Sequence, residues 1–426
     1  MPAVPQTLEA TGLSASLLEQ LIFKILHFSG EKMGRDLAGQ LGVRFSLIDP
    51  ILEGLRKQRL IDVRNSLGYG SVSSVFTLSE AGRARARECM EDNQYADRAP
   101  VPLAQYVSAV REQRLKSGWL TKEALDLAYQ HMVVSPQVLR QIGPAINSGK
   151  SFLIYGQPGN GKTFLAEALF KVDSSPIYVP YAIEYSGTII KVFDPVYHQP
   201  IEDVSEESVM AVSSDQGHDR RWVLCKRPFI VTGGELTMDM LDLNYIEAAK
   251  IYEAPFQLKA NNGIYLVDDF GRQRCTPAEV LNRWIVPMDR RVDFLSFNNG
   301  GKIEVPFETF LIFSTNLRPD QLGDEAFLRR IQYKMLMKSP EEEEFCEIYR
   351  RYCKQENLAF DPTLLDKFLL KHYRSTGKRY RRCHPRDVIS HALDLIEFER
   401  LPRELSERVL DEAFDSVFVD SHGMDD

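Results

Sequence analysis

The sequence is poor in the residues that would mark a secreted, metal-binding or membrane protein. Its 426 residues include six cysteines and eight histidines, and none of them has a spacing typical of a metal site. The apolar stretch Leu17–Phe28 contains Glu19 and Lys24 and is too short to cross a bilayer, and we expect no signal peptide. We therefore expect a cytoplasmic protein, without membrane insertion, whose thiols are reduced. The cysteines are Cys89, Cys225, Cys275, Cys346, Cys353 and Cys383.

A surplus of basic residues is also lacking. The net charge is −8, so the chain as a whole has no attraction for nucleic acid or for an acidic membrane. Hydrophobic residues make up 44% and charged residues 26%, as in ordinary globular proteins. The length exceeds that of one core, and we predict four regions from the patterns described below: residues 1–90, 91–124, 125–338 and 339–426.

One segment matches a complete phosphate-loop pattern, G-x-x-x-x-G-K-[ST]. It reads Gly156-Gln157-Pro158-Gly159-Asn160-Gly161-Lys162-Thr163 and stands between a predicted strand, Ser151–Tyr155, and a predicted helix, Phe164–Lys171. Backbone N–H groups of such a loop and of the following helix surround phosphates, and the glycines allow close approach. We expect Lys162 to reach the β- and γ-phosphates and the Thr163 hydroxyl to ligate magnesium. All eight residues, with Phe164, are predicted to bind a nucleoside triphosphate.

Two further apolar strands end in polar side chains. The first, Gly263–Val267, runs into Asp268 and Asp269 about a hundred residues after the loop. This is a Walker B pattern, in which Asp268 holds magnesium and Asp269 orients the attacking water. The second, Phe310–Thr315, ends at Asn316, which is predicted to face the water or the γ-phosphate from between the other two strands.

These motifs and two arginine segments, in this order, resemble those of the AAA+ ATPases. Asp324–Ile331 resembles their arginine-finger segment, which implies that Arg329 or Arg330 acts on the nucleotide of a neighbouring subunit, with Arg330 favoured. His384–Val388 resembles their sensor 2, which implies that Arg386 detects the γ-phosphate. The resemblance spans about Leu125–Phe418. It implies an α/β core with a parallel sheet, a helical lid from about Ser339, ATP and magnesium as cofactors, and a homo-oligomeric ring, a hexamer.

A predicted hairpin narrows the resemblance to one group of AAA+ ATPases, and the sequence departs from that group in two respects. Phe310–Asn316 resembles the sensor 1 strand of these ATPases. Val292–Pro306 alternates about a turn at Phe297–Lys302, as in the group with an insertion before sensor 1, which includes MoxR-like ATPases and enhancer-binding activators. The GAFTGA loop of the activators is absent, which argues against sigma-factor remodelling. The second Walker B acid is Asp269 instead of the usual glutamate, so slow hydrolysis, or binding without hydrolysis, stays open.

The first ninety residues predict a separate domain. Helical spacing over Leu17–Leu26, Met33–Leu41 and Ser46–Gln58 is followed by strands at Leu60–Val63 and Ser71–Leu78 and a closing helix at Ser79–Glu88. Three helices and a hairpin resemble a winged helix-turn-helix. Asp49 and Glu53 in its candidate recognition helix would repel phosphate, whereas Arg56, Lys57, Arg59 and Arg64 are suited to contact it. Both protein binding and DNA binding therefore stay open.

Two functions from different classes follow. One is a mechanochemical ATPase that remodels an unknown protein partner, held by the N-terminal domain or by an insertion between the Walker motifs. That insertion is predicted to contain strands at Ile177–Tyr181, Ile183–Phe193 and Arg221–Val231, and it either faces a partner or extends the sheet edge. The other is a DNA-binding regulator whose oligomerisation is controlled by nucleotide. The complete catalytic set favours the first.

Overall fold

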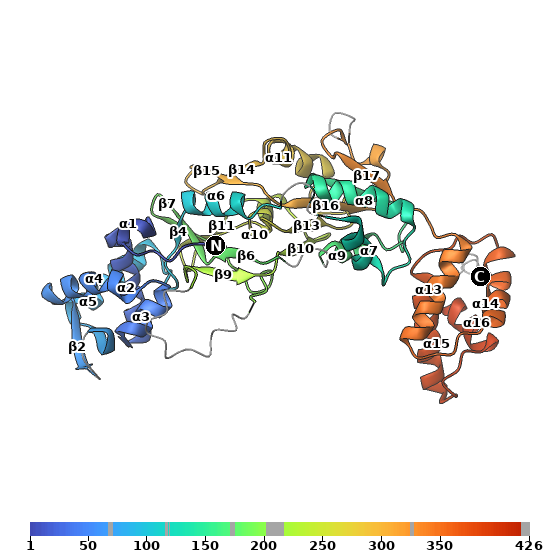
Figure 1. Ribbon diagram of the computed structural model, residues 1–426, viewed down its shortest axis with the longest axis horizontal. Coiled ribbons are helices and arrows are strands. Elements are labelled where there is room, and N and C mark those ends of the chain that lie inside the picture. The colour runs from blue at the N-terminus through green and yellow to red at the C-terminus, as the bar shows by residue number, and fades with distance from the viewer. Residues whose placement is uncertain are drawn as a thin grey trace, which may run out of the picture. The chain divides into compact units, whose positions relative to one another are not determined.

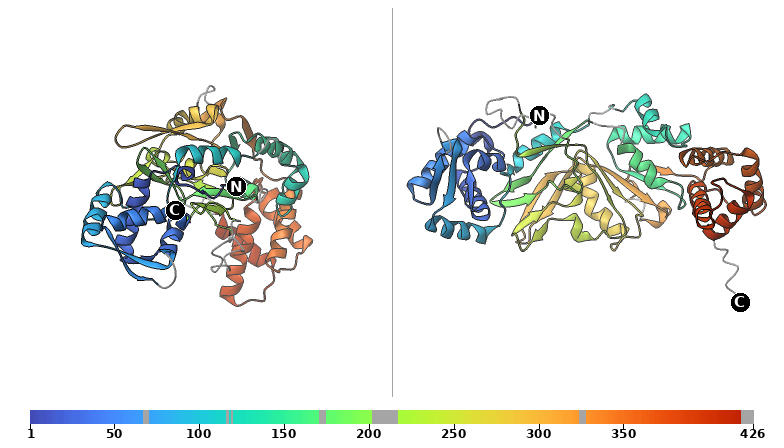
Figure 2. Two further views of the ribbon diagram at one scale, coloured as in Figure 1. Left: turned by 60° about the vertical axis from the view of Figure 1, so that its left-hand side comes forward. Right: turned by 90° about the horizontal axis from the view of Figure 1, so that it is seen from below.

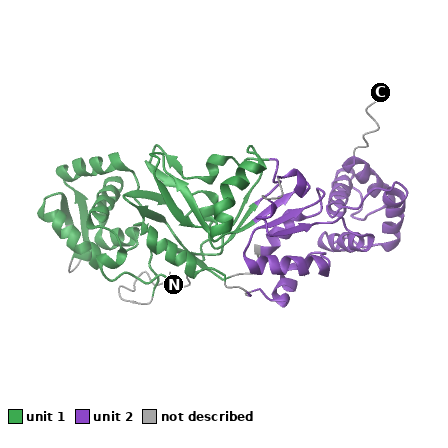
Figure 3. Ribbon diagram, turned by 90° about the horizontal axis from the view of Figure 1, so that it is seen from above, with its two compact units in different colours: residues 1–116, 173–266, 273–311 green, residues 117–172, 267–272, 312–426 purple. Residues whose placement is uncertain are grey.

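The computed structural model describes residues 1–66, 71–115, 118, 120–170, 175–201, 217–323 and 328–418. The chain forms two compact units, each assembled from stretches that are far apart in the sequence (Figure 3). Unit 1 comprises residues 1–116, 173–266 and 273–311, and unit 2 comprises residues 117–172, 267–272 and 312–426. Within the described part of the chain, none of the helices combines the length and the apolarity that a membrane span requires.

The N-terminal part of unit 1 combines helices with a small antiparallel sheet (Figure 1). The sheet has the order β1-β3-β2. Its elements are α1 (Leu8–Thr11), α2 (Ala15–Ser29), β1 (Glu31–Met33), α3 (Gly34–Leu41), α4 (Phe45–Lys57), β2 (Ile61–Ser66), β3 (Ser74–Leu78) and α5 (Glu80–Asp92).

These elements follow the order predicted from the sequence, with local differences. Strand β1 was not predicted, and the second hairpin strand begins at Ser74, after a 3₁₀ turn over Ser71–Ser73. The predicted turn at residues 68–70 lies outside the described residues. Side chains of Ser14 and Ser79 accept hydrogen bonds from the first turns of α2 and α5, which explains where these helices begin. The winged-helix resemblance itself stays a prediction.

The rest of unit 1 is a layered arrangement of short strands. A five-stranded mixed sheet has the order β11-β12-β8-β7-β4, and β6 pairs with β9. The members are β4 (Val101–Pro102), α6 (Leu103–Glu112), β6 (Ile177–Pro180), β7 (Ala182–Tyr185), β8 (Thr188–Lys191), β9 (Trp222–Cys225), β10 (Phe229–Thr232), β11 (Asn244–Ile246), β12 (Ile251–Glu253), α10 (Phe256–Lys259), β13 (Ile264–Val267), α11 (Pro277–Arg290), β14 (Val292–Ser296) and β15 (Lys302–Pro306).

Two of the predicted long strands are wrong. Ile183–Phe193 is a hairpin, β7 and β8, because Ser186 and Gly187 both adopt positive φ, at 49° and 81°. Arg221–Val231 is divided between β9 and β10, which lie in different sheets. Residues 101–112, which fall in the predicted linker, form β4 and α6.

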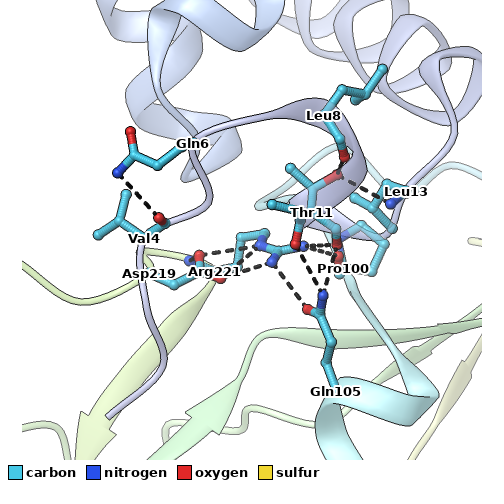
Figure 4. A network of polar contacts seen from close by, with 10 residues as sticks. Val4, Gln6, Leu8, Thr11, Leu13, Pro100, Gln105, Asp219 and Arg221 are labelled. Atoms are coloured by element: carbon cyan, nitrogen blue, oxygen red, sulfur yellow. Dashed lines mark hydrogen bonds and ion pairs between the residues drawn. The ribbon is translucent and has the colours of Figure 1, made fainter.

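A buried ion pair joins the N-terminal helices to this layered part (Figure 4). Arg221 and Asp219 lie 2.8 Å apart with side chains only 1% and 3% exposed. The Arg221 guanidinium also donates to the carbonyl oxygens of Thr11 and Pro100, at 2.9 and 3.4 Å, and to the Gln105 side chain at 3.2 Å. A buried charge with this many partners fixes three chain stretches relative to one another, at Thr11, at residues 100–105 and at residues 219–221.

The predicted hairpin of residues 292–306 is confirmed and its tip is packed. Strands β14 and β15 pair from Val292–Pro306 to Ser296–Lys302. At the tip, Phe297 is buried and contacts the rings of Tyr185 and Tyr252, with centroid separations of 6.2 and 5.0 Å. Both tyrosines belong to the five-stranded mixed sheet, so the hairpin and this sheet share a core.

A second five-stranded sheet contains the parallel strands of unit 2. In hydrogen-bonding order the sheet reads β10-β13-β16-β5-β17, and β16 (Phe310–Thr315) and β17 (Tyr333–Leu336) both run parallel to β5 (Phe152–Tyr155). The prediction that the strand before Asn316 lies between the two Walker strands is confirmed. Helix α9 (Lys162–Phe170) follows β5, and α7 (Lys122–Tyr129) and α8 (Pro136–Ser148) precede it.

The C-terminal part of unit 2 is helical and has its own core. Helices α13 (Glu342–Gln355), α14 (Pro362–Leu369), α15 (His384–Glu399) and α16 (Glu407–Val417) gather into one cluster, drawn in orange to red (Figures 1 and 2). We call this cluster the lid. Its interior is apolar and aromatic, with Phe345, Phe368 and Tyr373 fully covered. Three glutamates in the first turn of α13 favour the positive end of the helix dipole.

Candidate nucleotide-binding site

The phosphate loop connects β5 to α9 through three glycines with positive φ. Gly156, Gly159 and Gly161 have φ of 150°, 78° and 80°. A Cβ on Gly156 would lie 2.4 Å from the Met337 carbonyl oxygen, so no other residue fits there without displacing main chain. The positive φ angles at Gly159 and Gly161 also favour glycine. The loop therefore brings bare main chain to the first turn of α9, as phosphate binding requires.

Lys162 is buried behind this loop. Its ammonium donates to the carbonyl oxygens of Gly156 and Gln157, each at 3.1 Å, and to Asn316 Oδ1 at 2.7 Å. Burial lowers the pKa of Lys162, while the negative charges of Asp269 and Asp268 oppose that shift. The ammonium is thus held where the loop, Asn316 at the end of β16 and the carboxylates of Asp268 and Asp269 converge.

Thr163 and Asp268 are in direct contact. The Thr163 hydroxyl donates to Asp268 Oδ2 at 2.8 Å. A hydroxyl and a carboxylate oxygen are hard ligands of the kind that Mg²⁺ prefers, and here they converge from two segments of the chain. The donor set therefore fits the predicted metal.

Asn316 connects Lys162 to Asp269. Its Oδ1 accepts from Lys162, and its Nδ2 donates to Asp269 Oδ1 at 2.9 Å. Asp269 has a φ of 47°, a left-handed conformation that Asp adopts more readily than most residues. The Phe270 N–H donates to the Ser314 carbonyl at 2.7 Å and fixes the two strand ends together.

The predicted arginines lie elsewhere in unit 2. Arg386, in the first turn of α15, is 65% exposed and pairs with Asp387 at 2.9 Å. Arg329 is exposed, and Arg330 precedes β17, where its carbonyl accepts from the Ser151 hydroxyl at 3.0 Å. The rest of the finger segment, residues 324–327, lies outside the described residues. The roles of these arginines stay predictions.

The turn before α15 contacts the phosphate loop and was missed in the sequence. The Cys383 N–H donates to the Gly159 carbonyl at 2.9 Å, and a Cβ on Gly159 would lie 2.5 Å from Cys383 Sγ. Asn160 is fully buried and donates to the Ser339 hydroxyl at 3.3 Å. The sequence places Arg381, Arg382 and Cys383 immediately before the predicted sensor 2 motif at His384, but its spacing did not indicate that Cys383 bonds the loop.

Burial shifts the titration of the residues around this turn. It raises the pKa of the Cys383 thiol to about 11 and lowers the pKa of His384 to about 4, to which the charge of Arg381 also contributes. On the other side of the loop, Phe164 is half exposed and meets the ring of His131 edge-on at 6.0 Å. Among the described residues, groups of three or more His, Cys, Asp or Glu arranged to hold a metal are absent.

Comparison with known proteins matches one family model, over the C-terminal helices. Residues 341–416, which coincide with α13–α16, match a family described as a domain of unknown function (DUF8689). Curated proteins give no match. Among solved structures, NtrX from Brucella abortus is similar with a TM-score of 0.38 and 12% sequence identity. That match covers 79% of this chain and 65% of NtrX, which is less than two thirds of that protein.

Proposed function

We propose that the protein binds ATP with magnesium and hydrolyses it, as an AAA+ ATPase with a hairpin before sensor 1. The observation that carries this proposal is the hydrogen-bonded chain Lys162–Asn316–Asp269, which lies beside the Thr163–Asp268 contact. A phosphate-binding loop alone supports nucleotide binding. A carboxylate and an amide held next to the loop lysine supply, in addition, the groups that position a water molecule.

Each residue has a role that follows from its contacts. Main-chain N–H groups of the loop and Lys162 would bind the phosphates, and Lys162 would exchange its loop carbonyl contacts for phosphate oxygens. Thr163 and Asp268 would hold Mg²⁺, which neutralises charge on the β- and γ-phosphates. Asp269 would accept a hydrogen bond from the water, and the Asn316 amide keeps that carboxylate oriented.

We further propose a ring that remodels a protein partner. Arg330, or Arg329, would reach the nucleotide of the next subunit, as the finger segment of the resemblance implies. Within unit 1, the buried Arg221 pair and the packed hairpin tip support transmission of movement to the N-terminal helices as one body.

The DNA-binding alternative has its own observation in its favour. The two acids of α4 that would repel phosphate are engaged within the domain: Asp49 accepts from the Ser71 hydroxyl at 2.6 Å, and Glu53 pairs with Arg56 at 3.4 Å. Lys57 and Arg59 at the end of the same helix are exposed. Lys57 and Arg59 are therefore accessible for contact with a phosphate backbone.

One assay of the full chain separates the candidates. ATP turnover is measured with Mg²⁺, with the metal chelated, and with added duplex DNA at two salt concentrations. Metal-dependent turnover unaffected by DNA supports the remodelling ATPase. Turnover that rises with DNA at low salt supports the regulator. A chain that binds no ATP under any of these conditions overturns both.

A further inference from the structure

Two arginines of the lid hold one main-chain segment of the core. Arg351 on α13 donates through Nη1 to the carbonyl oxygens of Gln130 and Met132, at 3.0 and 3.2 Å. Arg382, in the turn before α15, donates to the Val133 carbonyl. Three carbonyl groups in four residues are thus bound by guanidinium groups from the lid, and all of these residues belong to unit 2.

Arg382 is the more deeply placed of the two. Its side chain is 12% exposed, against 42% for Arg351, and it pairs with Glu344 of α13 at 2.8 Å. Burial lowers the pKa of Arg382, and the Glu344 carboxylate opposes that shift. Among the described residues its Nε atom has no hydrogen-bond partner. Burying a guanidinium in this way costs free energy. The contacts of Arg382 with Glu344 and with the Val133 carbonyl have to offset that cost.

The segment that these arginines hold is attached to the helix of the phosphate loop. The Tyr129 hydroxyl donates to the Leu165 carbonyl on α9 at 2.8 Å. His131 packs edge-on against Phe164, which follows the magnesium-ligand candidate Thr163. Residues 130–133 therefore lie against the first turns of α9.

The residue next to Arg382 touches the loop itself. Cys383 donates to the Gly159 carbonyl, and its sulfur packs on Gly159 so closely that a Cβ would collide with it. Helix α15 begins at the following residue and carries Arg386 in its first turn. The contacts that hold Arg382 therefore also set the position of this turn, and of Arg386, relative to the phosphate loop.

We propose that Arg382 is a positioning residue for the γ-phosphate. By joining the Val133 carbonyl to Glu344 it sets the lid turn against the phosphate loop, so that arginine side chains of the lid meet the third phosphate. Arg351 provides a second, more exposed hold on the same segment. This inference rests on the proposed ATP site and on the predicted role of Arg386. It requires that loss of Arg382 weakens ATP binding more than ADP binding, since ADP lacks the group that the lid arginines meet.

The test compares Arg382→Met with a matched control, Arg374→Met. Arg374 is also a lid arginine with two ion pairs, to Glu342 at 2.5 Å and Asp366 at 2.8 Å, but both partners lie inside the lid. Dissociation constants for ATP and for ADP are measured on the full chain with Mg²⁺, together with thermal stability. For Arg382→Met we expect ATP affinity to fall by about tenfold to a hundredfold and ADP affinity by clearly less. Arg382→Lys, which can reach one partner but not both, should give an intermediate ATP affinity.

Several outcomes decide the question. A folded Arg382→Met protein with the wild-type ratio of ATP to ADP affinity overturns the inference, as does an Arg374→Met protein that changes this ratio equally. If Arg382→Met does not fold, Glu344→Gln replaces it, because that variant keeps the guanidinium and removes only its charged partner, and an unchanged ratio would again overturn the inference. A wild-type chain that binds no ATP would overturn the proposed function, and the inference with it.

Discussion

Lys162 and Asn316 are joined by a 2.7 Å hydrogen bond although 154 positions separate them in the chain. The lysine is the first residue of α9, after the loop that follows β5, and the asparagine directly follows β16, the neighbouring strand. Parallel strands end at the same edge of a sheet, and in open α/β sheets ligands bind at that edge. The contact therefore joins the group that would bind phosphate to the group that would orient Asp269.

The first prediction separates these two groups. Lys162→Ala should abolish tight ATP binding, because it removes the positive charge at the β- and γ-phosphates. Asp269→Asn should keep ATP binding and lose turnover, because only the group that orients water is removed. Nucleotide affinity and single-turnover hydrolysis are measured for both variants. An Asp269→Asn protein that hydrolyses ATP at the wild-type rate would show that Asp269 has no catalytic role.

A second prediction concerns the buried Arg221–Asp219 pair within unit 1. Arg221→Met leaves the Asp219 carboxylate buried without its counter-charge, so unfolding in denaturant should show a loss of about 3–5 kcal/mol. The double variant Arg221→Met with Asp219→Leu should recover part of that loss. As a control, Arg318→Met removes an exposed pair with Asp320 and should change stability little. Equal effects of the Arg221 and Arg318 substitutions would contradict a structural role for the buried pair.

The sequence predicted which side chains meet at the sheet edge better than it predicted the structure around them. Gly156–Thr163, Asp268, Asp269 and Asn316 stand directly after apolar strands, and local order along the chain determines which side chains meet at a parallel sheet edge. The hairpin β7–β8 was predicted as one strand because Ser186 and Gly187 interrupt the alternation without a proline or an Asn-Gly pair.

Contacts between residues that are far apart in the sequence could not be predicted from the hydrophobic pattern or the motifs. The Arg382 contacts to Val133 and Glu344 join residues 249 and 38 positions apart, and no periodicity records such a pairing. The burial of Arg221 could not be predicted either. Arginine is mostly found at protein surfaces, and only the folded structure shows that this side chain is buried.

A third prediction concerns the folding stability of the protein at acidic pH. Burial lowers the pKa of His384 from 6.5 to about 4, so the folded chain stays neutral at this residue while the unfolded chain takes up a proton. Stability contributed by the neutral ring is complete above pH 6.5 and is lost as the pH falls towards 4. At 1.36 kcal/mol per pKa unit the loss is about 3 kcal/mol.

The measurement compares the pH dependence of unfolding for the wild type and for His384→Gln. Glutamine does not titrate and can still bond the Tyr373 hydroxyl, which lies 2.9 Å from His384 Nδ1. The variant should therefore show a shallower decline between pH 6.5 and 4. Parallel curves over this range would contradict a buried neutral histidine.

The last prediction tests whether subunits share active sites. Arginine fingers contribute roughly 10³–10⁵ in kcat by neutralising charge in the transition state. Arg330→Ala should therefore keep ATP affinity nearly intact while turnover collapses, and Arg329→Ala should have the smaller effect if Arg330 is the finger. Mixing Arg330→Ala protein with Lys162→Ala protein should restore part of the activity, because one subunit supplies the finger and the other an intact pocket. Titrating the mixture at constant total protein gives a maximum at intermediate ratios if the finger acts between subunits. The trans-acting ring would be wrong if mixed subunits assemble without any recovery while the wild type hydrolyses ATP as a monomer.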